Sequence, residues 1–313
     1  MLSDNARGAL FMTVGMAAFV LNDTLMKLVS ADLPLFQAIF LRGVLTTLAF
    51  ATIAWWMGAL RLPEMNGDRW LIAVRVVAEC GATFFFLTAL FNMPLATLTA
   101  ILQAAPLTIA LAGAVFLREP VGWRRFLAIA VGFLGVLLIV RPGPDGIDVY
   151  ALYALAAVGF VTLRDLVTRR MPPAVPSMLL ALATAGGVTV FAALGALSED
   201  WVRPAASSWT YLGGAVVFII AGYLLSIVAM RVGELGVVSP FRYTGLVWAL
   251  ILGLLVFGDW PDNLTKLGAA LIVGTGIFTL YREQRLARQL ARARAGRAVD
   301  NPPESPYTAG TRG

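Results

Sequence analysis

Ten hydrophobic segments follow one another along the chain, separated by short breaks that contain proline, glycine or charged residues. About 20 apolar residues suffice for an α-helix to cross the hydrocarbon core of a membrane. Each segment approaches that length, and no break is long enough to form a separate domain. The pattern predicts an all-α integral membrane protein with ten transmembrane helices. The segments occupy residues 8–28, 35–57, 70–91, 95–117, 123–140, 149–168, 176–197, 209–230, 236–257 and 265–281.

The composition agrees with this prediction and excludes several classes of protein. Of the 313 residues, 59% are hydrophobic and 13% are charged, whereas soluble domains hold about 45–50% apolar and about 25% charged residues. Cys80 is the only cysteine and histidine is absent, which excludes disulfide frameworks, Cys/His zinc sites and histidine-dependent triads. No metal and no cofactor are expected. The sequence contains no Walker loop for ATP, so energy must come from a gradient or from exchange.

Lysine and arginine are distributed unevenly between alternate breaks, which predicts the orientation of the chain. Nine arginines and the arginine-rich tail lie on the side of the N-terminus, whereas the other side carries only Lys27, Arg141, Arg203 and Lys266. We therefore expect a bacterial inner (plasma) membrane protein with both termini in the cytoplasm. Residues 1–7 form the N-terminal segment, and residues 284–313 form an Arg-rich and then disordered tail. The net charge of +6 lies mostly in that tail, and without a soluble basic domain nucleic acid is not an expected partner.

The two halves of the chain are spaced alike, which indicates an internal repeat. Each half holds five predicted spans, an odd number, so the second half must enter the membrane from the opposite side. The repeat is therefore inverted, and its predicted units are residues 8–141 and 148–283. Inverted repeats commonly enclose a substrate site that opens alternately to either side. Three positions of the first half recur about 142 residues later: Asp23, Lys27 and Pro34 are matched by Asp165, Arg169 and Pro176.

Short motifs occur in order along both halves. They are Phe40-Leu41-Arg42-Gly43, Ala104-Ala105-Pro106, Leu117-Arg118-Glu119-Pro120, Gly132-Phe133-Leu134-Gly135-Val136, Ser239-Pro240-Phe241-Arg242-Tyr243-Thr244, Val247-Trp248-Ala249, Val256-Phe257-Gly258-Asp259 and Tyr281-Arg282-Glu283. Together they resemble the repeat of the EamA family in the drug/metabolite transporter superfamily. The resemblance implies two inverted five-helix repeats, with a cavity lined by the first four helices of each. The Arg-Tyr-Thr stretch followed by Trp-Ala is most similar to bacterial members assigned to riboflavin or S-adenosylmethionine transport.

A secondary transporter of small organic metabolites is the leading interpretation. Its substrate is expected to be an amino acid, nucleoside, vitamin or cofactor, moved by alternating access with proton coupling or by exchange. The alternatives are an intramembrane enzyme acting on a lipid-type substrate and a non-transporting membrane scaffold. Such an enzyme needs clustered acids for a metal or a nucleophile beside a base, which the isolated Asp23, Glu79 and Asp165 do not supply, so we predict no enzymatic activity. Glycines of the fifth and tenth segments allow close helix packing and leave a homodimer open.

Polar side chains within or near the spans are the candidate functional residues, because a charge in lipid needs a partner or a task. Arg242 is followed by Tyr243 and preceded by the helix-breaking Pro240, which suits a planar or negatively polarised substrate. The alternative is a structural arginine that caps carbonyl groups or pairs with Glu79. The predicted substrate-binding residues are Arg242, Tyr243, Trp248, Gln103, Arg75 and Tyr223.

Glu79 is the predicted proton-coupling residue. It lies near the middle of the third segment, where burial disfavours the charged form of a carboxylate. Arg75 lies four residues earlier on the same helix face, so a purely structural ion pair between the two is the alternative. If a substrate competes for Arg75, its binding and the protonation of Glu79 become linked.

A repeated acid-base spacing near the end of the first helix of each half predicts two gates. Asp23 and Lys27 are four residues apart, as are Asp165 and Arg169, so each pair shares a helix face. The inversion of the repeat places the two pairs near opposite membrane faces, where they could exchange partners as each side opens. The alternative is a solvated salt bridge at each helix end, which contributes little.

Overall fold

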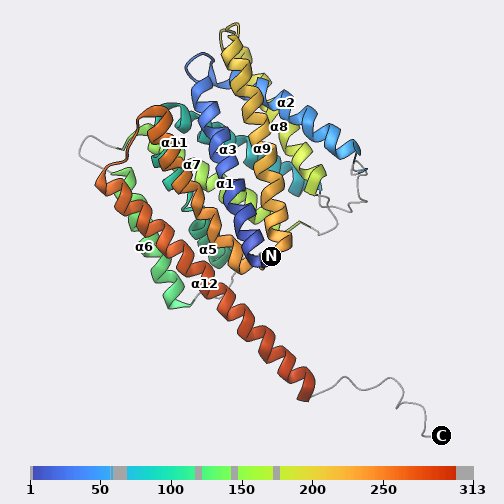
Figure 1. Cartoon of the computed structure of the whole chain (residues 1–313), viewed down its shortest axis with the longest axis vertical. Coiled ribbons are helices and arrows are strands. Elements are labelled where there is room, and N and C mark those ends of the chain that lie inside the picture. Colours follow the sequence, from blue (N-terminus) through green and yellow to red (C-terminus); the bar gives the residue numbers. More distant parts are fainter. Residues whose placement is uncertain are drawn as a thin grey trace, which may run out of the picture.

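The computed structural model describes residues 3–56, 58, 69–116, 122–141, 147–171 and 177–300. Ten helical spans within these residues are long and apolar enough to cross a membrane, and they form one bundle (Figure 1). Eight spans are built on one α-helix each: α1 (Asp4–Val29), α2 (Leu35–Trp56), α3 (Arg69–Asn92), α6 (Trp123–Val140), α7 (Val149–Arg169), α8 (Ser177–Gly195), α9 (Ala206–Val232) and α12 (Asn263–Asp300). A short 3-10 turn, η1 (Ala196–Ser198), extends α8.

The fourth and ninth spans are broken. The fourth consists of α4 (Leu95–Leu102) and α5 (Ala105–Phe116). The ninth consists of α10 (Leu235–Val238), the 3-10 helix η2 (Ser239–Tyr243) and α11 (Thr244–Phe257). These two spans occupy the same position in their respective halves, so the breaks are a repeated feature of the fold.

Local residues explain where several helices begin and end. Ser3 precedes α1 and its hydroxyl accepts a hydrogen bond from the Ala6 N–H at 3.3 Å. Asp148 precedes α7 and accepts one from the Tyr150 N–H at 3.1 Å. Both side chains satisfy a backbone donor that has no partner within the first turn of its helix. Gly258 ends α11 with a φ of 72°, a left-handed conformation that glycine adopts without steric cost.

The two halves of the chain interleave instead of forming separate bundles. α1 packs against α9, and the corresponding helix of the second half, α7, packs against α3. α2 packs against α8, and α6 packs against α12, so each of these helices meets its own counterpart. A two-fold relation between two five-helix repeats produces this exchange of partners. Because each repeat has an odd number of spans, the two cross the membrane in opposite directions, and the predicted inverted-repeat fold is confirmed.

The fifth and tenth spans cross closely on one side of the bundle (Figure 1). A Cβ atom added to Gly135 in α6 would lie 2.7 Å from the Gly268 carbonyl oxygen in α12, closer than the two atoms can approach. Gly132 is also buried in this interface, whereas Gly274 is exposed and would meet nothing within 4 Å. The glycines at 132 and 135 therefore serve packing within the chain, and they do not require a second copy of it.

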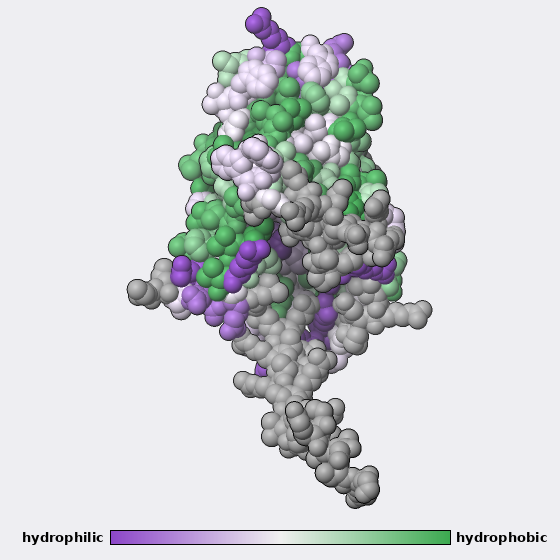
Figure 2. Space-filling model, turned by 90° about the vertical axis from the view of Figure 1, so that its right-hand side faces the viewer, coloured by the Kyte–Doolittle hydropathy of each residue, from purple (hydrophilic) through white to green (hydrophobic). Residues whose placement is uncertain are grey.

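The outside of the bundle is apolar, as expected for a surface that faces lipid. Trp55, Phe116 and Trp123 are each 70% exposed. Figure 2 shows hydrophobic residues over the upper and middle part of one face, with hydrophilic residues at the top and in the lower part. α1 begins and α12 ends on the same side of the bundle (Figure 1), and α12 carries the Arg-rich segment as far as Asp300. The predicted disordered end, residues 301–313, lies outside the described residues.

Candidate functional site

The breaks in the fourth and ninth spans meet at the centre of the fold. Gln103 follows α4, and its Nε2 donates to the backbone carbonyl of Arg242 in η2 at 3.4 Å. Pro106 and Pro240 lie beside the two breaks, and proline cannot donate the backbone hydrogen bond that a continuous helix requires. Irregular backbone at membrane depth is tolerated where it lines a cavity. The two breaks therefore mark the position of a site.

A cavity of about 450 Å³ lies at these breaks, between the two repeats. It reaches Arg125 in the first turn of α6 and Arg169 at the end of α7. Successive spans cross the bundle in alternate directions, so the start of the fifth span, α6, and the end of the sixth span, α7, both lie on the side where α1 begins. The cavity thus extends from the centre toward the side of both termini. Its polar and charged lining residues are Asp23, Thr99, Gln103, Arg125, Arg164, Asp165, Arg169, Ser239, Arg242, Tyr243 and Thr279.

Tyr243 is the most buried of the predicted substrate-binding residues in this lining. It is 5% exposed, and among the described residues its hydroxyl has no hydrogen-bond partner. The hydroxyl lies against Gly276 of α12, where any added side chain would collide with it. A buried hydroxyl without a partner is uncommon in a native fold, and a polar substrate atom or a water molecule in the cavity could supply one.

Lys27 ties three spans together on the side away from the termini. Its ammonium donates to the backbone carbonyls of Leu90, at 3.2 Å, and of Met93, both at the end of α3. The Nζ atom also lies 5.3 Å from the centre of the Phe257 ring, at the end of α11. The last carbonyls of a helix carry partial negative charge and lack intrahelical donors, so a cation is stabilised there. The predicted ion pair of Lys27 with Asp23 is not formed, because these carbonyls hold the ammonium instead.

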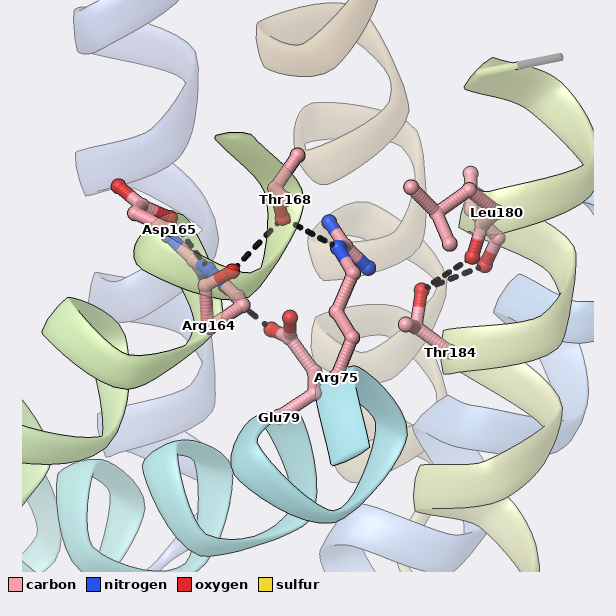
Figure 3. A network of polar contacts seen from close by, with 8 residues as sticks. Arg75, Glu79, Arg164, Asp165, Thr168, Leu180 and Thr184 are labelled. Carbon is pink, nitrogen blue, oxygen red and sulfur yellow. Dashed lines mark hydrogen bonds and ion pairs between the residues drawn. The ribbon is translucent and has the colours of Figure 1, made fainter. Parts of the chain in front are cut away.

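Arg164 in α7 joins the cavity to a second group of charges (Figure 3). Its Nε donates to the Asp165 carboxylate at 2.9 Å and its Nη1 donates to the Glu79 carboxylate at 3.4 Å. Arg75 directs its Nε to the Thr168 hydroxyl at 2.9 Å. Both arginine side chains thus bridge α3 and α7. The same-helix ion pair of Glu79 with Arg75, which was the alternative to a coupling role, is replaced by an ion pair between helices. Glu79 itself does not line the cavity.

The corresponding position of the first repeat carries a neutral partner. Asn22 Nδ2 donates to the Asp23 carboxylate at 2.9 Å, and Arg42 Nη1 donates to the Asn22 amide oxygen at 3.4 Å. Asn22-Asp23 and Arg164-Asp165 are 142 residues apart, so each repeat presents an aspartate beside a polar donor. The sequence presents Arg164 only as one of several charges within the spans that could line a cavity, and it gives no indication for Asn22. Their common offset from Asp23 and Asp165 was the signal that could have identified them.

The remaining predicted residues lie elsewhere in the bundle. Trp248 packs against the main hydrophobic core, and Tyr223 packs edge-on against Phe50, with ring centres 5.8 Å apart. Arg75, as described, contacts α7. Of the residues predicted for substrate binding and gating, the structure brings together Arg242, Tyr243, Gln103, Asp23, Asp165 and Arg169 around the cavity.

Ten apolar spans in two interleaved inverted repeats, with a polar cavity at their broken helices, define the class of inverted-repeat membrane proteins with a central site. Comparison with known proteins agrees. The chain belongs to the EamA-like transporter family, whose family model matches residues 6–141 and 148–281. A solved crystal structure that is 21% identical has the same fold, with a TM-score of 0.62 over 88% of this chain and 99% of the other.

Curated relatives carry the names of small-molecule transporters and not of enzymes. An S-adenosylmethionine uptake transporter of Rickettsia conorii is 28% identical over 195 residues, which is 61% of this chain and 65% of that protein. The protein of the same name from Rickettsia felis is 25% identical over 84% of this chain and 89% of its own length. A riboflavin transporter of Vibrio cholerae is 28% identical over 70% of this chain and 74% of its own length. The match thus spans slightly less than two thirds of the first of these relatives.

Proposed function

We propose that the protein is a secondary transporter that carries a small organic metabolite of the vitamin or cofactor class by alternating access. The observation that carries the proposal is the polar cavity between the two repeats, which extends toward one side of the bundle while Lys27 ties helices together at the other. Its volume of about 450 Å³ lies within the range of about 300–1,000 Å³ that small-molecule sites occupy. The names of the relatives make S-adenosylmethionine and riboflavin the first substrates to test.

In this proposal Arg242, Tyr243 and Gln103 bind the substrate. The Arg242 guanidinium offers forked hydrogen bonds and a planar face for stacking, and the unpaired Tyr243 hydroxyl offers one more polar contact. Arg75, Tyr223 and Trp248 lie outside this cavity, and they remain predictions for the state in which the other side is open.

Glu79 is proposed as the proton-coupling residue, acting through Arg164. The Arg164 side chain touches both Glu79 and the cavity carboxylate Asp165. A proton on Glu79 removes one of the two negative charges that share the Arg164 guanidinium. Arg164 is then available to bind Asp165 and the substrate. Binding in the cavity and protonation outside it are then linked by one side chain. Exchange without proton coupling, with Glu79 as a structural partner only, is the alternative.

Lys27 and Arg169 are proposed as the two gates. They occupy equivalent positions of the two repeats, and they differ in their surroundings: Lys27 is bound at the end of α3, whereas Arg169 lines the cavity. When the repeats exchange conformations, Lys27 releases α3 and the ends of α7 and α9 close around Arg169. Both gates then follow from one rearrangement.

The proposed location is a bacterial inner membrane with both termini in the cytoplasm. The supporting observations are that both ends of the described bundle lie on one side, and that lysine and arginine are concentrated there. A homodimer is also part of this proposal.

Transport by the purified full chain in proteoliposomes tests the function. We expect counterflow of labelled S-adenosylmethionine or riboflavin above the level of empty liposomes. Arg242→Ala should lower the rate at least about tenfold, the effect of losing about 1.4 kcal/mol of binding. Arg124→Ala is the matched control, because Arg124 is exposed at the start of α6 and does not line the cavity. A failure of wild type to move either compound, or equal loss in both variants, contradicts the proposal.

A further inference from the structure

Asp23 presents a carboxylate to the cavity without an ion pair. The hydrogen bond that it accepts comes from the neutral Asn22 amide at 2.9 Å, and no cation among the described residues forms an ion pair with it. Arg42 is the nearby cation whose charge acts on Asp23, but its Nη1 is directed at the Asn22 amide oxygen, so the two side chains make no direct ion pair. A negative charge at membrane depth is costly unless it has a partner or a task. The structure therefore leaves the Asp23 carboxylate without a cation in direct contact, and a positive group that enters the cavity can take that place.

The equivalent carboxylate of the second repeat is already neutralised. Asp165 also lines the cavity, but the Arg164 guanidinium lies 2.9 Å from its carboxylate. The two aspartates thus share a position in the repeat and differ in their partner, an amide for Asp23 and a guanidinium for Asp165. Only Asp23 lacks a direct ion pair and so has its carboxylate available to a positively charged ligand.

The cavity is polarised along its length. Asp23 lies one helical turn before Lys27, near the end that Lys27 ties together. Phe19, one turn earlier on the same helix, and Phe86 of α3 also line the cavity, and aromatic faces attract organic cations. Arg169 lines the end of the cavity toward the side of the termini, and Arg242 lines it at the break in the ninth span. A ligand with a positive group at one end and a polar or negative group at the other fits this arrangement.

We propose that Asp23 binds the positively charged group of the substrate, a sulfonium or an ammonium, and that the transporter selects cationic or zwitterionic metabolites over neutral ones. This inference rests on the proposed transport function and names its substrate class. It also separates the relatives, because S-adenosylmethionine carries a sulfonium and riboflavin is neutral.

Two ligands that differ in one charge test the assignment. S-adenosylmethionine and S-adenosylhomocysteine differ by a methyl group that makes the sulfur positive. Calorimetric titration of the purified full chain should show at least about tenfold tighter binding of the sulfonium compound, the factor that corresponds to one charge-assisted contact. Asp23→Asn should bring the two affinities within about twofold of each other. Equal affinities in wild type, or an unchanged preference in folded Asp23→Asn, would overturn the inference.

Controls separate charge from folding. Asp4→Asn is the same change on the same helix, at a side chain that is 77% exposed outside the cavity, and it should keep the full preference. Asp23→Glu keeps the charge and should keep the preference at lower affinity. If Asp23→Asn does not fold, Phe19→Leu replaces it and should lower the preference by removing the aromatic face. Tight riboflavin binding without sulfonium binding would refute this inference while supporting the proposed function, whereas binding of none of the three compounds would contradict both.

Discussion

Removal of the Lys27 ammonium should shift the protein toward the state that opens away from the termini. Lys27 donates two hydrogen bonds to the carbonyls of Leu90 and Met93. Hydrogen bonds that involve a charged group contribute about 1.5–3 kcal/mol each, so Lys27→Met should cost the present arrangement about 3 kcal/mol. Since about 1.4 kcal/mol corresponds to a factor of ten, the equilibrium should move by about 100-fold. If wild type favours the present arrangement by about 100 to 1, the Lys27→Met variant would populate both states about equally.

Accessibility of a single thiol measures this shift. Cys80 is the only cysteine of the chain, so a Cys80→Ala background leaves a cysteine introduced at the cavity position Thr99 as the sole target. A membrane-impermeant maleimide is applied to right-side-out and to inverted vesicles. Lys27→Met should raise the labelling rate from the side away from the termini and lower it from the other side.

The matched control for this prediction is Lys266→Met. Lys266 makes local contacts, with the Asn263 side chain at 3.1 Å and the Trp260 ring at 5.4 Å, so its removal should leave both labelling rates unchanged. Unaltered labelling in a folded Lys27→Met protein would refute the reasoning, because Lys27 would then contribute equally to both states.

Three further predictions concern packing, coupling and pH. Gly135→Leu should lower the stability of the purified protein by about 1–3 kcal/mol, because the new side chain collides with α12. The control Gly274→Ala should change the stability little, since nothing lies within 4 Å of that position. Equal melting temperatures for the two variants would contradict the packing account. Glu79→Gln should abolish accumulation driven by a pH gradient and retain exchange, and accumulation that persists in proteoliposomes would return Glu79 to a structural role. The Arg141 guanidinium and Thr265 lower the pKa of the Asp262 carboxyl, so the stability from this pair is present above the ordinary carboxyl pKa of about 4 and is lost as the pH falls below it. The melting temperature of Arg141→Ala should therefore fall less on acidification than that of wild type. Parallel plots of melting temperature against pH for the two proteins would contradict this account of the pair.

The spans could be predicted from sequence because their signal is local. A run of about 20 apolar residues must cross the membrane as a helix, and the repeat was visible in the 142-residue offset between Asp23 and Asp165. The breaks in the fourth and ninth spans were signalled by Pro106 and Pro240. The sequence does not indicate how far each break unwinds the helix, because this depends on the contact of Gln103 with the Arg242 carbonyl across the bundle.

The partners of the charged residues could not be predicted in the same way. Spacing favoured a partner four residues away on the same helix for both Lys27 and Glu79. Spacing is silent about neighbouring helices, and there the stronger partners were found: the carbonyls at the end of α3 for Lys27 and the Arg164 guanidinium for Glu79. In a bundle whose outer surface faces lipid, polar groups turn inward, so contacts between helices compete well with those along one helix.

The two repeats agree in fold but not in charge, and this difference bears on the mechanism. Arg42 is matched 142 residues later by Thr184, whose hydroxyl bonds to its own helix, and Glu79 has no acidic counterpart, because α9, the helix that corresponds to α3, contains no Asp or Glu. If the repeats were identical, exchanging their conformations would give two states of equal free energy. The unequal charges remove this degeneracy, because the exchange moves Arg42 and Glu79 into surroundings that the second repeat does not reproduce. A proton or a substrate charge can shift the equilibrium only through such a difference between states, so energy coupling must depend on the charges that differ between the two repeats, Arg164 of the second repeat included.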